Sequence, residues 1–219
     1  MKLLKSWKNN FVLVLILFLF LFTRLYKINS IPASVYWDEA SIGYNAYAIS
    51  TDLKDEWGEF LPLHIRAFGE FKLPIYIYSV AVLTKLFGIN EFTLRIPAVL
   101  FGLGIVILVY KNISKLAAFL VTVSPWLFIF SRTGYEAMAG LFFFLASVFS
   151  KNILLSTMLS IGAFYSYNSF RLFVPIFLAI RFLKESKKSL IWFISIAIFL
   201  ISLVPVVKLY HLDQGAVRL

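Results

Sequence analysis

The chain has no cysteine, only two histidines and few charged residues among its 219 positions. Without cysteine it has no disulfide framework, no thiolate nucleophile and no cysteine-based metal site. Charged residues make up 15% of the chain and hydrophobic residues 61%, with a mean hydropathy of +0.86. These values exclude an ordinary soluble domain and predict an all-α, polytopic membrane protein.

Basic residues outnumber acidic ones, and the formal net charge is +10. They are spread between apolar segments at intervals typical of membrane borders, so no nucleic-acid partner is predicted. The first segment has a cationic start and an apolar core from Phe11 to Phe22, as a signal peptide does. Because residues 23–26 are too bulky for a cleavage site, we expect an uncleaved anchor.

Seven segments are predicted to span the membrane, since a span needs roughly 20 apolar residues, or fewer where polar ends snorkel. They cover about 8–27, 96–111, 115–131, 135–150, 153–169, 171–184 and 189–208. An eighth apolar run, from Leu73 to Gly88, either spans or lies at the interface as an amphipathic helix. Lysine and arginine collect in cytoplasmic loops. The interfacial alternative is favoured because it puts on the inside the N-terminus and the basic turns at Lys111, Lys115, Lys151 and Arg181 to Lys188.

This topology predicts a cytoplasmic N-terminus and a long outer loop at about 28–95. Every acid except Glu185 then lies outside. The loop is too long for a simple connector. It is expected to contain two surface helices, one near Ala40 to Thr51 and one formed by the Leu73 run. Residues 1–219 are predicted to be a single module, and because the chain ends just after a span, we expect it to be a fragment.

The outer loop carries an ordered series of short motifs. They are Arg24-Leu25-Tyr26, Pro32, Trp37-Asp38-Glu39-Ala40, Tyr44-Asn45-Ala46-Tyr47, Phe71-Lys72-Leu73-Pro74, Leu86-Phe87-Gly88, Glu91 and Arg95-Ile96-Pro97. The series resembles the GT-C glycosyltransferases, in particular the family-39 group of protein O-mannosyltransferases and lipid A aminoarabinose transferases. The resemblance covers nearly the whole chain. It departs at Leu73, where many relatives have proline, and at Glu136, where an aspartate often stands.

The resemblance implies a seven-span module with two outer-surface helices in its first loop. It also implies an inverting enzyme that moves a sugar from a polyprenyl-phosphate donor to a hydroxyl acceptor on a protein, lipid or glycan at the outer face. A transporter or lipid flippase, in which intramembrane charges line a pathway, is the alternative. The charged residues gather at one face, and no span centre carries an ionisable group. This distribution favours the enzyme over a transporter. A non-catalytic scaffold subunit is a third alternative.

Adjacent acids at the start of the outer loop are the predicted catalytic residues. A carboxylate partly desolvated at a membrane surface gains basicity, and a hydroxyl acceptor needs a base as it attacks the sugar. Asp38 is predicted to be that base. Glu39 is expected to orient it, since neighbours on a helix do not point at one atom. The alternative is that Asp38 caps a helix starting near Ala40.

Glu136 lies at the outer end of the fourth predicted span, on the same side as Asp38. It is predicted to be a second active-site carboxylate that holds the acceptor or contributes to a divalent-metal site, and the alternative is capping of that span. Two or three carboxylates do not specify a metal, so no cofactor is assigned.

A polyprenyl-phosphate leaving group needs cations at the headgroup level. Lys72, Arg132 and Arg171 are the predicted phosphate ligands, with Arg66 and His64 as further candidates. Each cation has the alternative of snorkelling to lipid phosphate. Trp37 and Tyr44 are predicted to stack on sugar rings, although aromatic belts place such residues at every membrane interface.

Overall fold

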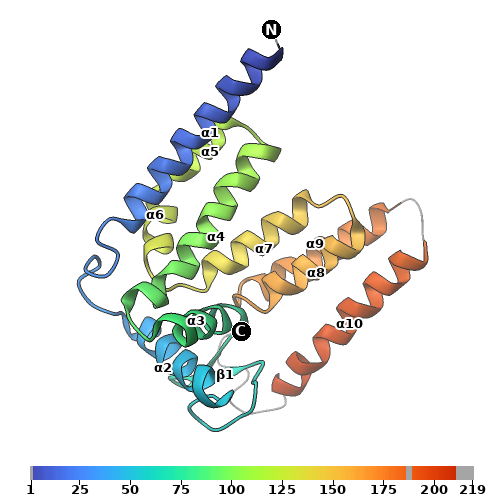
Figure 1. The fold of residues 1–219 in the computed structure, drawn as a ribbon. Coiled ribbons are helices and arrows are strands. Elements are labelled where there is room, and N and C mark those ends of the chain that lie inside the picture. Colours follow the sequence, from blue (N-terminus) through green and yellow to red (C-terminus); the bar gives the residue numbers. More distant parts are fainter. Residues whose placement is uncertain (1, 186–188, 211–219) are drawn as a thin grey trace.

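The computed structural model describes residues 2–185 and 189–210, and the side chains of residues 11–185 and 189–209. Within these residues the chain is all-helical apart from one short hairpin (Figure 1). The ten helices are α1 (Lys2–Leu25), α2 (Trp37–Asp52), α3 (Pro74–Phe87), α4 (Glu91–Asn112), α5 (Lys115–Val123), α6 (Pro125–Arg132), α7 (Ala137–Phe149), α8 (Ile153–Phe164), α9 (Phe170–Lys184) and α10 (Leu190–Tyr210). The hairpin strands are β1 (Ile65–Ala67) and β2 (Glu70–Lys72).

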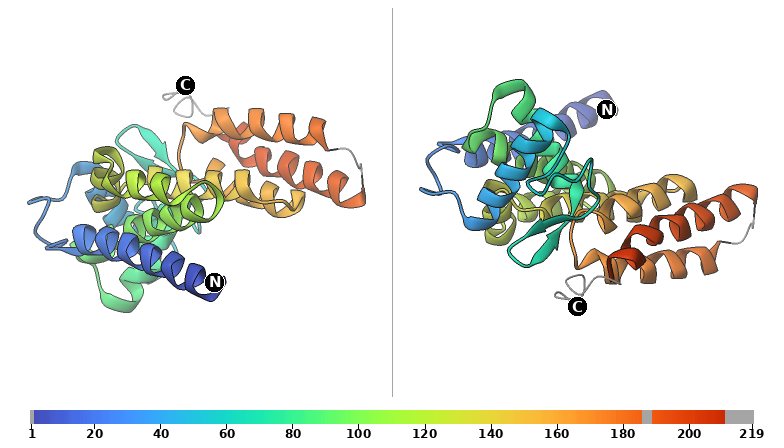
Figure 2. Two further views of the ribbon diagram at one scale, coloured as in Figure 1. Left: turned by 90° about the horizontal axis from the view of Figure 1, so that it is seen from above. Right: turned by 90° about the horizontal axis from the view of Figure 1, so that it is seen from below.

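The helices pack around two apolar cores. The larger core joins residues from α1 to α5 and α7, among them Phe20, Ile42 and Met138. The smaller core joins α8, α9 and α10 through residues such as Phe164, Leu178 and Phe199. In both views of Figure 2, α8, α9 and α10 lie together on one side of the molecule, and α7 connects them to the larger group.

Two helices, α4 and α10, are long and apolar enough to cross a membrane. A third span results if α5 and α6, which meet at an angle of 62°, are taken as one. Pro125 explains that break, because it has no amide hydrogen for the helix ladder and holds Ser124 extended. The structure therefore supports a helical protein with two or three candidate spans.

The prediction of seven spans is not supported. Helices α7 and α8 have 13 and 12 residues. At 1.5 Å per residue they rise only about 20 and 18 Å, against a hydrocarbon core of about 30 Å. The predicted segments ran past the helix ends into turns, such as residues 165–169 after α8.

Both helices expected in the long loop are present, as α2 and α3, and they pack against each other at one end of α4. Pro74 is the first residue of α3, where its fixed φ suits a helix start, and Gly88 ends that helix at φ +75°. Helix α2 begins three residues earlier than predicted, at Trp37. Because of this earlier start, Asp38 and Glu39 lie in the first turn of α2 rather than before the helix.

The β1–β2 hairpin between these helices was not predicted. Its register pairs Ile65 with Lys72, Arg66 with Phe71 and Ala67 with Glu70. The two-residue turn has positive φ at both Phe68 and Gly69, as a type I′ turn requires. Three-residue strands are too short to show a two-residue periodicity, so the glycine after Phe68 was the only sequence signal.

Gly102 on α4 faces side chains of α1, α6 and α7. A Cβ added there would stand 2.8 Å from Phe20 Cζ, 3.0 Å from Met138 Cε and 3.2 Å from Ser131 Cβ. We expect Gly102→Val to destabilise the protein by about 1–3 kcal/mol through overpacking. The measurement is the thermal unfolding midpoint in detergent, followed by tryptophan fluorescence. Leu100→Val, at an exposed position of the same helix, is the control, and an equal loss in both variants would contradict the packing argument.

Candidate active site

The predicted catalytic acids Asp38 and Glu136 lie around one buried ammonium group. Lys72 Nζ is 2.6 Å from Asp38 Oδ1, 3.8 Å from Glu70 Oε1 and 3.9 Å from Glu136 Oε1. The Lys72 side chain is 3% exposed and that of Asp38 18%. We call Asp38, Glu70, Glu136 and Lys72 the carboxylate cluster.

Three separate elements supply the carboxylate cluster. Asp38 is the second residue of α2, and Glu136 immediately precedes α7. Glu70 and Lys72 are two residues apart on β2, so they face the same side of the strand. Residues almost 100 positions apart therefore meet because the long loop folds back onto the start of α7.

The electrostatics of the cluster favour a proton on Glu136. Burial raises the pKa of the Glu136 carboxyl, the Lys72 ammonium opposes that rise, and repulsion from Asp38 and then Glu70 adds to it. Burial, reinforced by Tyr36 and Asp38, also raises the pKa of Tyr135 to about 12, which keeps that hydroxyl neutral. Titratable groups with shifted pKa values in a shared site are typical of general acid–base chemistry.

The raised pKa of Glu136 predicts a stability effect. A carboxyl whose pKa is higher in the folded state favours folding when protonated, and this contribution is lost as the pH rises through the folded-state pKa. Glu136→Gln mimics the protonated form, so we expect it to match wild type at pH 4 and to unfold at a higher temperature at pH 7. Glu91→Gln, at an exposed position, should show no such pH-dependent gap. A Glu136→Gln variant less stable than wild type at pH 7 would contradict this account.

Glu39 is used inside the fold and does not join the carboxylate cluster. Its side chain is 1% exposed. Oε1 accepts hydrogen bonds from Gly134 N (2.7 Å) and Arg95 Nε (3.1 Å), and Oε2 accepts one from Tyr36 N (3.0 Å). Both oxygens are occupied, so Glu39 is a positioning residue. It fixes the first turn of α2, on which Asp38 stands.

Arg95 is the buried partner of Glu39, and the sequence analysis did not single it out as a site residue. Its guanidinium donates to the carbonyls of Ile28 (2.7 Å), Pro32 (3.3 Å) and Ser34 (3.1 Å). It thereby fixes the chain between α1 and α2. Its place in the motif Arg95-Ile96-Pro97 was the only sequence signal.

The structure contradicts both capping alternatives. Helix α2 starts at Trp37 with Tyr36 as its N-cap, and Glu39 rather than Asp38 accepts the N-cap amide. Glu136 stands at the N-cap of α7 but makes no side-chain cap hydrogen bond. The carboxylates of Asp38 and Glu136 are therefore directed at Lys72 rather than at helix ends.

The three predicted phosphate ligands have different surroundings. Lys72 lies within the carboxylate cluster. Arg132 donates to the carbonyls of Tyr26 (2.8 Å), Ile31 (2.8 Å) and Thr23. Its donors therefore satisfy carbonyl groups in the last turn of α1 and in the loop that follows it. Arg171 differs from both, because its Nε and Nη2 are buried without a hydrogen-bond partner in the described part of the chain.

A row of aromatic rings borders Asp38. Trp37 stacks on Phe68 at 5.3 Å, Tyr36 meets Trp37 edge-on at 6.0 Å, and Tyr36 stacks on Tyr135 at 6.1 Å. Trp37 and Phe68 are 58% and 62% exposed. Tyr44 is also exposed but lies two helical turns beyond Trp37, about 10 Å along the axis. Of the predicted stacking residues, only Trp37 belongs to the row.

No family model matches the chain, and neither a curated protein nor a solved structure is significantly similar to it. In the residues that the structure describes, no group of three or more histidine, aspartate or glutamate side chains is arranged to hold a metal ion. The resemblance to GT-C glycosyltransferases, and the assignment of no cofactor, stay predictions from the sequence.

Proposed function

We propose that the chain is the membrane module of an inverting, GT-C-type glycosyltransferase that moves a sugar from a polyprenyl-phosphate to a hydroxyl acceptor. One observation carries this proposal. Asp38 and Glu136, chosen from the sequence as active-site acids, lie 2.6 and 3.9 Å from the same buried ammonium group. Carboxylates with different surroundings in one site are suited to handling the acceptor proton.

In this proposal Asp38 removes the proton of the acceptor hydroxyl as its oxygen attacks the anomeric carbon. The bond from that carbon to the phosphate oxygen breaks, and its electron pair leaves with the polyprenyl phosphate. A single displacement inverts the anomeric centre. Lys72 orients Asp38 through their 2.6 Å contact, and Glu136, 3.9 Å from the same ammonium group, holds the acceptor by a hydrogen bond.

The aromatic row supplies a surface for the sugar. Sugar rings pack on exposed aromatic faces, and Trp37, which stacks on Phe68, immediately precedes Asp38 in α2. Tyr44, about 10 Å further along α2, contacts a more distant part of the substrate. The phosphate of the departing carrier requires a cation, and Lys72, one of the predicted phosphate ligands, lies within the carboxylate cluster.

The proposed enzyme is an integral membrane protein with a cytoplasmic N-terminus. The apolar helices α1, α4, the bent pair α5–α6 and α10 cross the bilayer, and α7, α8 and α9, which together return the chain to the inner side, pack beside them. Helices α2 and α3 and the hairpin then lie at the outer face. This orientation rests on the excess of lysine and arginine at the opposite ends of the helices.

The test uses the purified protein in liposomes with radiolabelled polyprenyl-phosphate mannose or polyprenyl-phosphate aminoarabinose, and solubilised membranes as the acceptor mixture. We expect label to leave the lipid extract and to become covalently attached to an acceptor. Label that crosses to the other leaflet while staying on its lipid would indicate a flippase. Label that neither moves nor transfers with any donor would indicate a scaffold, and either result contradicts the proposal.

A further inference from the structure

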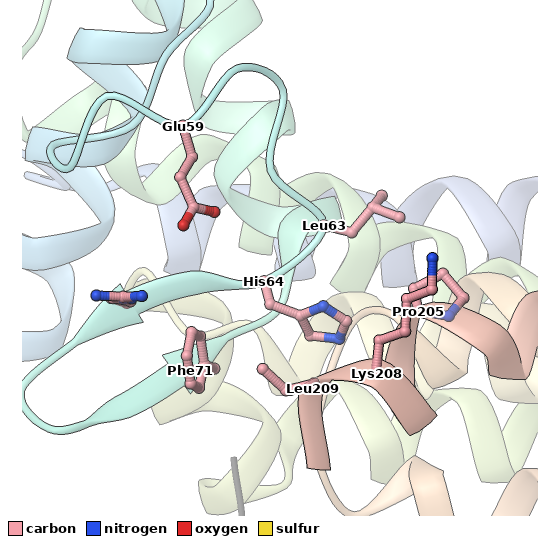
Figure 3. Close-up of a pocket in the computed structure, with 8 residues that line it drawn as sticks. Glu59, Leu63, His64, Phe71, Pro205, Lys208 and Leu209 are labelled. Carbon is pink, nitrogen blue, oxygen red and sulfur yellow. The ribbon is translucent and has the colours of Figure 1, made fainter. Parts of the chain in front are cut away.

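A second polar site lies on the other side of the hairpin. A cavity of about 340 Å³ opens between the hairpin, the loop before it and the end of α10 (Figure 3). Its lining residues are Glu59, Leu63, His64, Arg66, Phe71, Pro205, Lys208 and Leu209. Segments nearly 150 positions apart in the sequence thus enclose one space.

The hairpin separates this cavity from the carboxylate cluster. Side chains alternate between the two faces of a strand. Glu70 and Lys72 face the cluster, whereas Phe71 between them lines the cavity, together with Arg66, its partner across the hairpin. One face of a short hairpin therefore serves an acidic site and the other a basic one.

Positive charge prevails around the cavity. Arg66 and Lys208 line it, and Arg171 lies close enough to act on His64. Burial and repulsion from Arg171 lower the pKa of His64 to about 4, so its imidazole is neutral at neutral pH. Glu59 is the one acid among the lining residues, against two lining cations, and Arg171 adds positive charge near His64.

Several nitrogen atoms at this site are buried without a partner. In residues 2–185 and 189–210 no hydrogen-bond acceptor is within reach of Arg66 Nε or of Arg171 Nε and Nη2, and His64 Nε2 also has no partner. Neither guanidinium forms a salt bridge to a described residue. Buried donors nearly always find acceptors, and leaving a charged donor unsatisfied costs more than leaving a neutral one.

We propose that this cavity binds a phosphate group, with Arg66 donating hydrogen bonds to its oxygens and with Lys208 at the rim and Arg171 near His64 contributing positive charge. The planar guanidinium fork matches phosphate geometry, and charge-assisted hydrogen bonds of this kind are strong. The phosphate belongs either to a lipid headgroup or to a soluble compound, since both present the same oxygens. This inference does not rest on the proposed transferase activity.

The test measures the thermal unfolding midpoint of the detergent-purified chain with two probes. Phosphatidic acid is compared with diacylglycerol, which lacks only the phosphate, and sodium pyrophosphate is compared with sodium chloride at equal ionic strength. We expect a phosphate probe to raise the midpoint by several degrees while its matched control does not. A rise with phosphatidic acid alone identifies a lipid headgroup, and a rise with pyrophosphate identifies a site open to soluble phosphates.

The double variant Arg66→Gln/Arg171→Gln should lose this rise, and Lys54→Gln, at an exposed position of the same segment, should keep it. If the double variant does not fold, Arg66→Gln alone is expected to need about tenfold more probe, because a hydrogen bond to a charged group contributes about 1.5–3 kcal/mol. The inference fails if neither probe raises the midpoint, if the matched controls raise it equally, or if the arginine variants respond as wild type does.

Discussion

Replacing Glu39 by glutamine is expected to lower the free energy of unfolding by about 3–5 kcal/mol, because it leaves a buried charge without a counterion. Arg95 is fully buried, and Glu39 is the only acid within 4 Å of its guanidinium in the described residues. Glutamine keeps the size and one oxygen but loses the charge and the second acceptor. The three carbonyls that Arg95 also contacts do not neutralise it.

The measurement is the unfolding free energy in detergent, obtained from a denaturant titration. Glu91→Gln is the matched control, and as an exposed acid in the first turn of α4 it should change stability by no more than about 1 kcal/mol. Arg95→Gln should cost at least as much as Glu39→Gln, and the two losses should not add in the double variant, since they share one interaction. If Glu39→Gln lowers the free energy of unfolding as little as the control does, the Glu39–Arg95 pair does not stabilise the chain between α1 and α2.

Much of the helical layout is predictable from the sequence, because apolar runs and prolines fix where helices form. The runs at 96–111 and 189–208 appear within α4 and α10, and Pro74 starts α3 as expected. The lengths of α7 and α8 were not predictable from hydropathy, since the predicted segments at 135–150 and 153–169 run past the helix ends into turns such as Tyr165 to Ser169. Hydropathy indicates which residues prefer an apolar environment, but it does not indicate where the backbone hydrogen bonds of a helix end.

The candidate site was predictable in part. Charge parity predicted Asp38 and Glu136 on one side of the membrane, and the structure brings both within 4 Å of Lys72 Nζ. The roles of the arginines were not predictable. The sequence does not distinguish an arginine that binds backbone carbonyls, as Arg132 does, from one that binds a phosphate. The hairpin separates the cavity at Arg66 from the cluster at Lys72. Its three-residue strands are too short to be recognised in the sequence.

Asp38→Asn is expected to slow sugar transfer by about 10²- to 10⁴-fold, the range for loss of a general base. Asparagine fits the same space, so Lys72 can still donate to its amide oxygen, but that oxygen does not take the acceptor proton. Donor binding should be unchanged, because the substituted group acts on the acceptor. Stability should change little, since Asp38 is partly exposed and Lys72 keeps Glu70 and Glu136 nearby.

Transfer from radiolabelled polyprenyl-phosphate mannose or aminoarabinose measures the rate, and retention of label on the immobilised protein measures donor binding. Asp52→Asn, the exposed last residue of α2, should transfer at the wild-type rate. Glu136→Gln should lose less than Asp38→Asn, because glutamine at position 136 still forms a hydrogen bond to the acceptor, whereas asparagine at position 38 does not take the acceptor proton. The reverse order, with Glu136→Gln inactive and Asp38→Asn active, would move the base to Glu136, since only the group that takes the acceptor proton loses its function on conversion to an amide.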